Sequence, residues 1–169
     1  DVAKYGIPNS KMTPVPMGIR SDQVGDGEKA RAPHTDAPVL LYLGIILQLR
    51  KSQILVQVLQ QVRLRYPKAT LIYVGEGQLP SDRQAVEQEA VRLGLSDAVT
   101  ITGFLPMEKA WEHVKQADIC FSPFYPIPVL LSTSPTKLIE YMVRQNRTYE
   151  VIAESVNEQY RKLLGLKVE

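Results

Sequence analysis

Four short apolar runs, separated by helical patterns, constrain the fold of this chain more than any other feature of its sequence. Residues 39–44 read VLLYLG and residues 70–75 read TLIYVG, so both runs are almost continuously apolar and both end in glycine. The runs at 99–103 (VTITG) and 119–122 (ICFS) are shorter. Such runs are typical of strands that are buried on both faces, as they are in a parallel sheet.

The intervals between these runs carry apolar residues at helical spacing. The first pattern covers 52–66, with Ser52 as the expected N-cap, and the third covers 107–116. In the second, which covers 81–93, Ser81 to Gln84 has the form of a capping box and Gly94 is expected to end the helix. This alternation predicts an α/β fold, a Rossmann-like doubly wound parallel sheet with strand order 3-2-1-4 and helices on both faces.

The two ends of the chain differ from this central part. Residues 1–38 are rich in proline and glycine, so we interpret them as a linker and entry segment that leads into a domain at 39–142. Helical spacing resumes from 135 to 164, as one long helix or two helices end to end, and 143–169 are expected to form the C-terminal helix.

Composition excludes several classes of function. Twenty Lys and Arg against eighteen Asp and Glu give a net charge of +2, which does not indicate a nucleic-acid partner. The longest apolar run, 39–47, is far shorter than the roughly 20 residues that span a bilayer. The single cysteine, Cys120, excludes an internal disulfide and a multi-cysteine metal site, and we expect it and Trp111 to lie in the core. The cytosol is the default compartment, and His34, in a polar segment, is expected to be solvated.

Ligands of open parallel sheets bind beyond the carboxyl ends of the strands, so the loops at those ends hold the candidate site residues. After the first strand, Arg50 and Lys51 precede a predicted helix N-terminus and are either a diphosphate site or a solvated pair. After the third strand, Gly103 to Pro106 form a turn that is either structural or the contact for a flat base.

A further helix is expected to begin at Ser134 and Pro135, with serine as its cap and proline in its first position. Its first turns combine free amide groups with Lys137 and Glu140. The Glu140 carboxylate either complements the helix dipole or accepts hydrogen bonds from both hydroxyls of a ribose.

Taken in order, these segments resemble the C-terminal, donor-binding domain of group 1, family-4 retaining glycosyltransferases of the GT-B fold. The resemblance covers residues 5 to 142. It rests on the series Pro16-Met-Gly18, Leu41-Tyr-Leu-Gly44 with Arg50-Lys51, Val74-Gly-Glu-Gly77, Thr102-Gly-Phe-Leu-Pro106, Ala117-Asp118 and Ser134-Pro-Thr-Lys-Leu-Ile-Glu-Tyr-Met142. The last segment is the most specific.

The resemblance implies a nucleotide-diphosphate-sugar donor that is bound without a metal ion or another cofactor. The residues implied in donor binding are Gly44, Arg50 and Lys51 near the diphosphate, Gly103, Phe104 and Leu105 near the base, and Ser134, Thr136, Lys137 and Glu140 on the last helix, with Glu140 on the ribose. No catalytic residue is assigned, because the resemblance places the family's catalytic histidine in an N-terminal acceptor-binding domain, which we expect to be missing from these 169 residues. That missing domain would also mediate any attachment to a membrane surface.

The chain departs from the family pattern at several points. Ser132 stands where the family has a first acid, and Ile45 replaces a common arginine. After Met142 the family continues with further strands, whereas Val143 begins a stretch that resembles the family's last helix. The sheet is therefore expected to lack its last strands. Either the fourth strand is an exposed edge that a long helix or a second copy covers, or a segment is absent between these two residues.

The first functional hypothesis is therefore the donor-binding half of a retaining glycosyltransferase, inactive without its acceptor domain. The alternatives are a non-catalytic nucleotide-binding module and a fragment of a GT-B-type sugar-nucleotide epimerase. A flavodoxin-like signalling domain would require an acidic cluster at the strand ends, and Asp118, the nearest acid, stands at the beginning of its strand.

Overall fold

The computed structural model describes residues 5–6, 8–11, 34, 36–123, 137–138 and 140–141. Its sheet contains β1 (Val39–Leu43), β2 (Thr70–Val74), β3 (Val99–Ile101) and β4 (Ile119–Phe121). All three strand pairs are parallel, and the order is β3-β2-β1-β4. The predicted fold class and strand order are thus confirmed.

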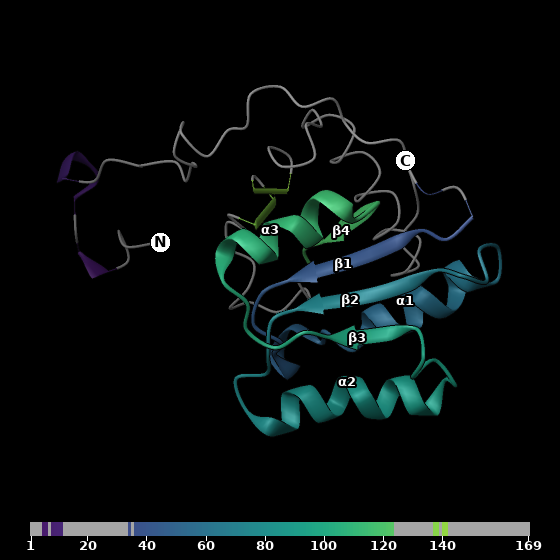
Figure 1. The fold of residues 1–169 in the computed structure, drawn as a ribbon. Coiled ribbons are helices and arrows are strands. Elements are labelled where there is room, and N and C mark those ends of the chain that lie inside the picture. The colour runs from purple at the N-terminus through teal and green to yellow at the C-terminus, as the bar shows by residue number, and fades with distance from the viewer. Residues whose placement is uncertain are drawn as a thin grey trace, which may run out of the picture.

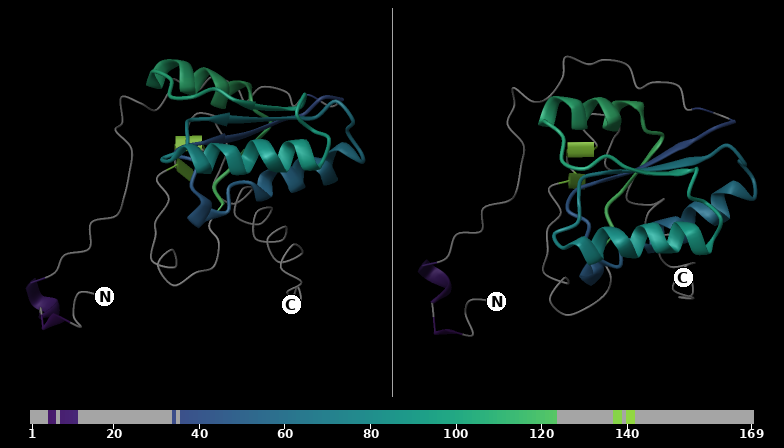
Figure 2. Two further views of the ribbon diagram at one scale, coloured as in Figure 1. Left: turned by 90° about the horizontal axis from the view of Figure 1, so that it is seen from below. Right: turned by 60° about the horizontal axis from the view of Figure 1, so that its bottom comes forward.

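Helices cover both faces of this sheet, as Figures 1 and 2 show. The helix α3 (Met107–Gln116) lies on one face, and α1 (Ile54–Arg63) and α2 (Pro80–Arg92) lie on the other. Short 3-10 helices, η2 (Asn9–Lys11) and η4 (Gln48–Arg50), complete the described elements. The three layers follow from right-handed crossovers, which place the successive helices on opposite faces where the strand order reverses.

Alternating side chains of β1 serve the two faces. Leu40 and Tyr42 pack in a core with α1 and α2, whereas Leu41 and Leu43 pack in a second core with α3. All four side chains are buried, which explains why the run is continuously apolar. Burial of each leucine side chain stabilises the fold by about 1.5–3 kcal/mol.

The second helix begins earlier than its predicted capping box. α2 begins at Pro80, whose fixed φ suits the first helical position, and the Asp82 carboxylate accepts a hydrogen bond of 2.9 Å from the N–H of Leu79. The prediction of a box from Ser81 to Gln84 is therefore wrong. The predicted end is confirmed, because Gly94 follows the helix with a φ of +68°.

The start of the first helix also differs from the prediction. Ser52 does not cap it: α1 begins at Ile54, and η4 precedes it. The Ser52 side chain instead donates backward to the carbonyl of Leu47 at 3.3 Å, and its own carbonyl accepts from the Tyr73 hydroxyl at 2.8 Å. Ser52 is buried, and its hydroxyl bonds the loop at Leu47 and does not cap the helix.

The amino-terminal edge of the sheet is tied together by Asp118. Its buried carboxylate accepts hydrogen bonds from the N–H of Val39 at 2.7 Å and of His34 at 2.9 Å, and it lies 3.0 Å from Nδ1 of His34. His34 is exposed, as expected, but it also pairs with this carboxylate, which the sequence did not predict. His34 and Val39 thereby both supply hydrogen bonds to a buried acid, which lowers the cost of burying its charge. Cys120 is only half-buried and packs beside the α3 core, and Trp111 is also half-buried, so both lie at the margin of the core and not inside it.

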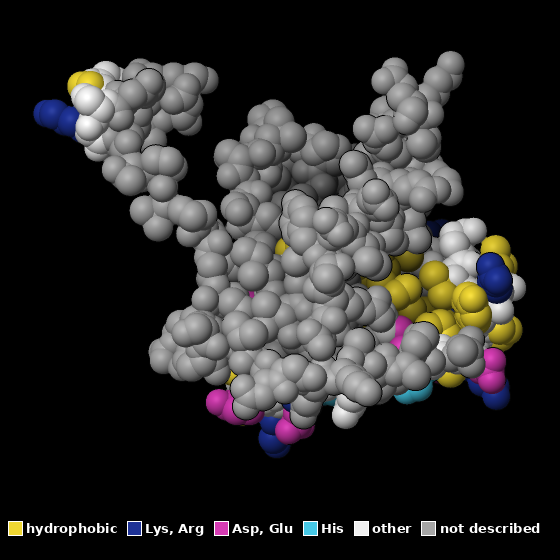
Figure 3. Space-filling view, turned by 90° about the horizontal axis from the view of Figure 1, so that it is seen from above, with side chains coloured by type: hydrophobic (Ala, Val, Ile, Leu, Met, Phe, Trp, Pro, Cys, Tyr) yellow, Lys and Arg dark blue, Asp and Glu magenta, His cyan; other side chains and the backbone are white. Residues whose placement is uncertain are grey.

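The predicted exposure of β4 is tested only in part. Within the described residues β4 pairs only with β1, and 43% of Ile119 is exposed. Seen from above, hydrophobic side chains gather on one side of the described surface (Figure 3). Self-association across this strand stays a prediction. The junction between Met142 and Val143 and the helix predicted at 143–169 lie outside the described residues.

Candidate functional site

The loops that follow β1 and β2 run side by side at the carboxyl edge of the sheet. Gly44 donates to the carbonyl of Val74 at 3.0 Å, and Ile46 donates to that of Glu76 at 2.9 Å. A Cβ on Gly75 would lie 2.1 Å from the carbonyl oxygen of Gly44, so only glycine permits this approach. The glycines that end the two apolar runs, Gly44 and Gly75, therefore allow the two loops to approach each other closely.

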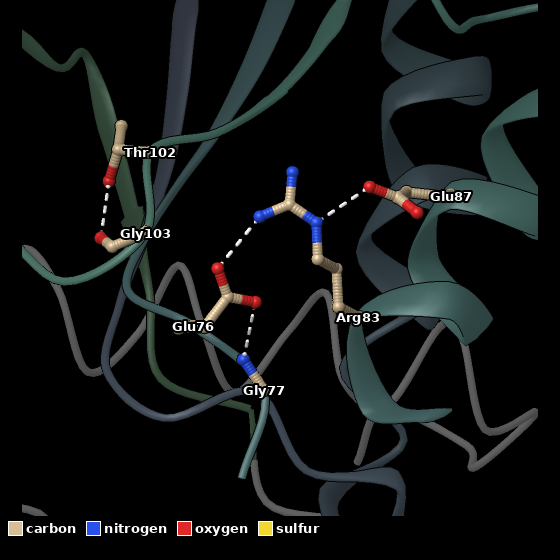
Figure 4. Close-up of polar contacts among 6 residues, drawn as sticks. All are labelled: Glu76, Gly77, Arg83, Glu87, Thr102 and Gly103. Carbon is tan, nitrogen blue, oxygen red and sulfur yellow. Dashed lines mark hydrogen bonds and ion pairs between the residues drawn. The ribbon is translucent and has the colours of Figure 1, made fainter. Parts of the chain in front are cut away.

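An ion network connects the β2 loop to α2 (Figure 4). The Glu76 carboxylate accepts from the N–H of Gly77 at 2.9 Å and from Nη1 of Arg83 at 2.7 Å, and Arg83 also donates to Glu87 at 2.7 Å. The hydrogen bond from Gly77, together with Arg83, lowers the pKa of Glu76 below its ordinary value despite partial burial. Glu76 therefore stays ionised and paired with Arg83. It lies beside the turn at Gly103, where an added Cβ would be 3.6 Å from the Glu76 carboxylate.

A cavity of about 440 Å³ opens where β1 and β4 end. Aromatic side chains on its wall include Phe104 and Phe121, and apolar groups make up most of the remainder. Arg50 and Lys137 are the only charged residues among the described ones that line it. The full lining consists of Tyr42, Leu43, Gly44, Ile45, Leu47, Arg50, Val74, Gly75, Phe104, Leu105, Met107, Ala110, Phe121, Ser122, Pro123 and Lys137.

Most of the predicted site residues that the structure describes come together here. The ones that line the cavity are Gly44, Arg50, Phe104, Leu105 and Lys137. Three others adjoin the lining residues without being among them: Lys51 next to Arg50, Gly103 at the start of the Phe104 turn, and Glu140, which pairs with Lys137 at 2.9 Å. Ser134 and Thr136 lie outside the described residues.

Two tyrosines were not predicted to shape this site. Tyr42 lines the cavity, and its hydroxyl donates to the carbonyl of Ile45 at 2.8 Å, which fixes the β1 loop. Tyr141 is buried and bonds the main chain of Leu43. A tyrosine within a buried strand needs a partner for its hydroxyl, and the carbonyl of Ile45 is that partner for Tyr42.

The described residues contain no cluster of three or more His, Cys, Asp or Glu side chains that would hold a metal ion. None of the helices in this part of the chain is long and apolar enough to cross a membrane.

Comparison with known proteins gives matches over the region that forms this site. Residues 37–146 match the model of a family described as glycosyl transferases group 1. Over 122 residues the chain is 25% identical to the GDP-mannose-dependent alpha-(1-6)-phosphatidylinositol monomannoside mannosyltransferase of Mycolicibacterium smegmatis, a match that covers 69% of this chain and 31% of the relative.

A solved structure shares the fold. The apo form of the lipopolysaccharide outer core galactosyltransferase WaaB matches with a TM-score of 0.53 and 18% identity, over 85% of this chain and 37% of that one. Anabaena HepE in complex with UDP and glucose matches with a TM-score of 0.49 and 21% identity, over 64% of this chain and 28% of that one. The matches thus span about a third of the length of each of these three proteins.

Proposed function

Because this chain belongs to the group 1 glycosyl transferases, we propose that its residues 39–142 are the donor-binding half of a retaining glycosyltransferase. The reaction would transfer a sugar from a nucleotide-diphosphate sugar to an acceptor. The mannosyltransferase relative is named for its dependence on GDP-mannose, a donor of this class.

The observation that carries this proposal is the chemistry of the cavity wall. Two cations, Arg50 and Lys137, line the cavity, and the other described residues of its wall are uncharged and largely apolar. Cations together with loop amides are suited to a diphosphate, and an apolar wall with an exposed aromatic ring is suited to a flat base. Phe104 supplies such a ring, since it lines the cavity and is 71% exposed.

We assign the individual roles from the family resemblance. Arg50 and Lys51 bind the diphosphate beside the Gly44 loop, and Ser134 and Thr136 assist. Gly103, Phe104 and Leu105 contact the base. Glu140 accepts from the ribose hydroxyls, using the carboxylate oxygen that does not bond Lys137. No divalent ion takes part in donor binding.

The acceptor and the remaining catalytic groups would come from a further, acceptor-binding domain. Catalysis depends on groups held on all sides of the reacting carbon. We therefore expect the 169-residue chain by itself to bind nucleoside diphosphates and to transfer no sugar.

Calorimetric titration of the purified chain with UDP, GDP and ADP, with and without EDTA, tests the proposal. We expect binding of at least one diphosphate that EDTA does not weaken. We also expect Arg50→Ala to lower its affinity about tenfold, equivalent to about 1.4 kcal/mol. Lys68→Ala, an exposed cation in the turn before β2, serves as the matched control and should bind as the unaltered chain does.

A folded chain that binds none of the three diphosphates at millimolar concentration would overturn the proposal. Incubation with nucleotide sugars separates the alternatives. Recovery of an epimerised sugar would favour the epimerase, and sugar transfer by this chain alone would contradict the expected need for a second domain.

A further inference from the structure

The cavity lies at the point where β1 and β4 separate. Their pairing ends with Tyr42 opposite Phe121. Shortly beyond, Pro123 has no N–H with which to continue a ladder. The next residue of β1, Leu43, therefore has main-chain groups that face β4 without a regular strand partner.

The Tyr141 hydroxyl occupies this position. It accepts a hydrogen bond of 2.9 Å from the N–H of Leu43, and it lies 3.4 Å from the carbonyl of Leu43 and 3.3 Å from that of Phe121. A phenol has one proton, so it donates to one of these two carbonyls at a time. One side chain thereby joins the ends of both strands.

The hydroxyl is well suited to this double role. Only 2% of Tyr141 is exposed, and burial, together with the nearby Cys120, raises the pKa of its phenol far above the ordinary value. Tyr141 therefore stays protonated across the physiological range, so that it both accepts and donates.

Tyr141 lies in the same segment as one cation and one acid of the candidate site, Lys137 and Glu140. Residues 137, 138, 140 and 141 are helical, and Lys137 and Tyr141, four positions apart, share one face of that helix. Lys137 lines the cavity and pairs with Glu140. Among the described residues, the Tyr141 hydroxyl thus makes the hydrogen bonds that attach the segment of Lys137 to the sheet beside the cavity.

We propose that Tyr141 is a positioning residue of the nucleotide site, whose hydroxyl holds the helical segment at the separation of β1 and β4 so that Lys137 faces the bound diphosphate. This inference rests on the proposed function. It concerns a residue that touches the main chain and not the ligand.

A matched control exists within the same fold. Tyr73 is equally buried, burial raises the pKa of its phenol far above the ordinary value, and its hydroxyl makes one hydrogen bond, to the carbonyl of Ser52. It packs in the core beneath α1 and α2 and does not line the cavity. A general cost of removing a buried hydroxyl applies to both tyrosines, whereas an effect through Lys137 applies to Tyr141 alone.

The test measures, by calorimetry, the affinity of Tyr141→Phe and Tyr73→Phe for the nucleoside diphosphate that the unaltered chain binds best, and their Tm in the absence of ligand. We expect both variants to lose a few degrees of Tm. We expect Kd to rise about tenfold in Tyr141→Phe and to stay within twofold in Tyr73→Phe. In a cycle with Lys137→Ala, the two losses of affinity should be far from additive, because Tyr141 acts through Lys137.

Several results would overturn the inference. They are an unchanged Kd in Tyr141→Phe, equal losses in both phenylalanine variants, additive losses in the cycle, or failure of Tyr141→Phe alone to fold, which would assign the hydroxyl to the stability of the domain. If the unaltered chain binds no diphosphate, the proposed function fails first, and the two failures are thereby distinguished.

Discussion

Lys51 offers a variant whose stability and ligand affinity should change in opposite directions. It is the one non-glycine residue of the described chain with a positive φ, at φ 50° and ψ 44°, and its N–H donates to the carbonyl of Gln48 at 2.8 Å. This left-handed conformation costs an L-residue about 1–2 kcal/mol. Lys51→Gly removes that cost, keeps the main-chain hydrogen bond, and adds about 0.5–1 kcal/mol of backbone entropy to be lost on folding. The free energy of unfolding should therefore rise by about 0.5–1 kcal/mol.

The same substitution removes a cation beside Arg50. A charge-assisted contact to a phosphate is worth about 1.5–3 kcal/mol. Because Lys51 is exposed, solvent screens part of that contribution, and about 1 kcal/mol is the appropriate expectation. Affinity for a nucleoside diphosphate should therefore fall about fivefold.

Urea unfolding followed by circular dichroism and calorimetric titration measure the two effects. Lys68→Gly is the control, since Lys68 is an exposed lysine without a positive φ, and it should lose about 0.5–1 kcal/mol of stability with unchanged affinity. A loss of stability in Lys51→Gly would refute the strain argument. An unchanged Kd would remove Lys51 from the site and leave Arg50 and Lys137 as its cations.

Two further predictions concern charge. Ile45→Arg, at a cavity residue that is 46% exposed, should strengthen diphosphate binding several-fold at low salt and less at high salt, whereas Ile119→Arg, at a residue that is 43% exposed and does not line the cavity, should leave the titration unchanged. Burial raises the pKa of Asp118, but hydrogen bonds from Val39 and His34 outweigh it and hold that pKa below its ordinary value. The ionised Asp118 carboxylate therefore stabilises the fold above the unfolded-state pKa of about 3.9, and this stabilisation is lost as pH falls through the folded-state pKa. Asp118→Asn should accordingly be less stable than the unaltered chain at pH 7. Urea titrations should show that this difference in the free energy of unfolding narrows below about pH 4.

The sequence sufficed to predict the sheet because its strands are buried on both faces. Continuous apolar runs are distinctive, and right-handed crossovers leave few orders for four parallel strands. All four strand positions and their order were predicted correctly. The start of the third helix at Met107 was also predicted correctly. The starts of the first two were not, because Ser52 and Ser81 have the residue type of a cap without its position. Whether a serine hydroxyl turns forward to a helix end or backward to Leu47 depends on packing around it.

Prediction of the site was limited in a different way. The loops after β1 and β3 follow from the rule that ligands bind at the carboxyl edge, and the rule places Arg50 and Phe104 at one cavity. The pairing of Asp118 with His34 and the bonding of Tyr141 to Leu43 join residues that are far apart along the chain. No local pattern specifies such contacts, so they appear only once the topology is known.

The two cations of the cavity come from distant parts of the chain, and this has a thermodynamic consequence. Arg50 belongs to a loop that backbone hydrogen bonds fix to the sheet, whereas Lys137 reaches the cavity through a segment that Tyr141 attaches. An anion that binds between the cations stabilises both its own site and the docking of that segment. The coupling is reciprocal, so a change that weakens the docking of the segment weakens the binding of the ligand by the same free energy.

At a hundred times its Kd a ligand adds about 2.7 kcal/mol to the stability of the state that binds it. An increment of that size exceeds what one hydroxyl contributes, about 0.5–1.5 kcal/mol. A nucleotide at saturation would therefore restore the docking that removal of the Tyr141 hydroxyl weakens, and the role of that hydroxyl would be visible in Kd and not in the saturated complex.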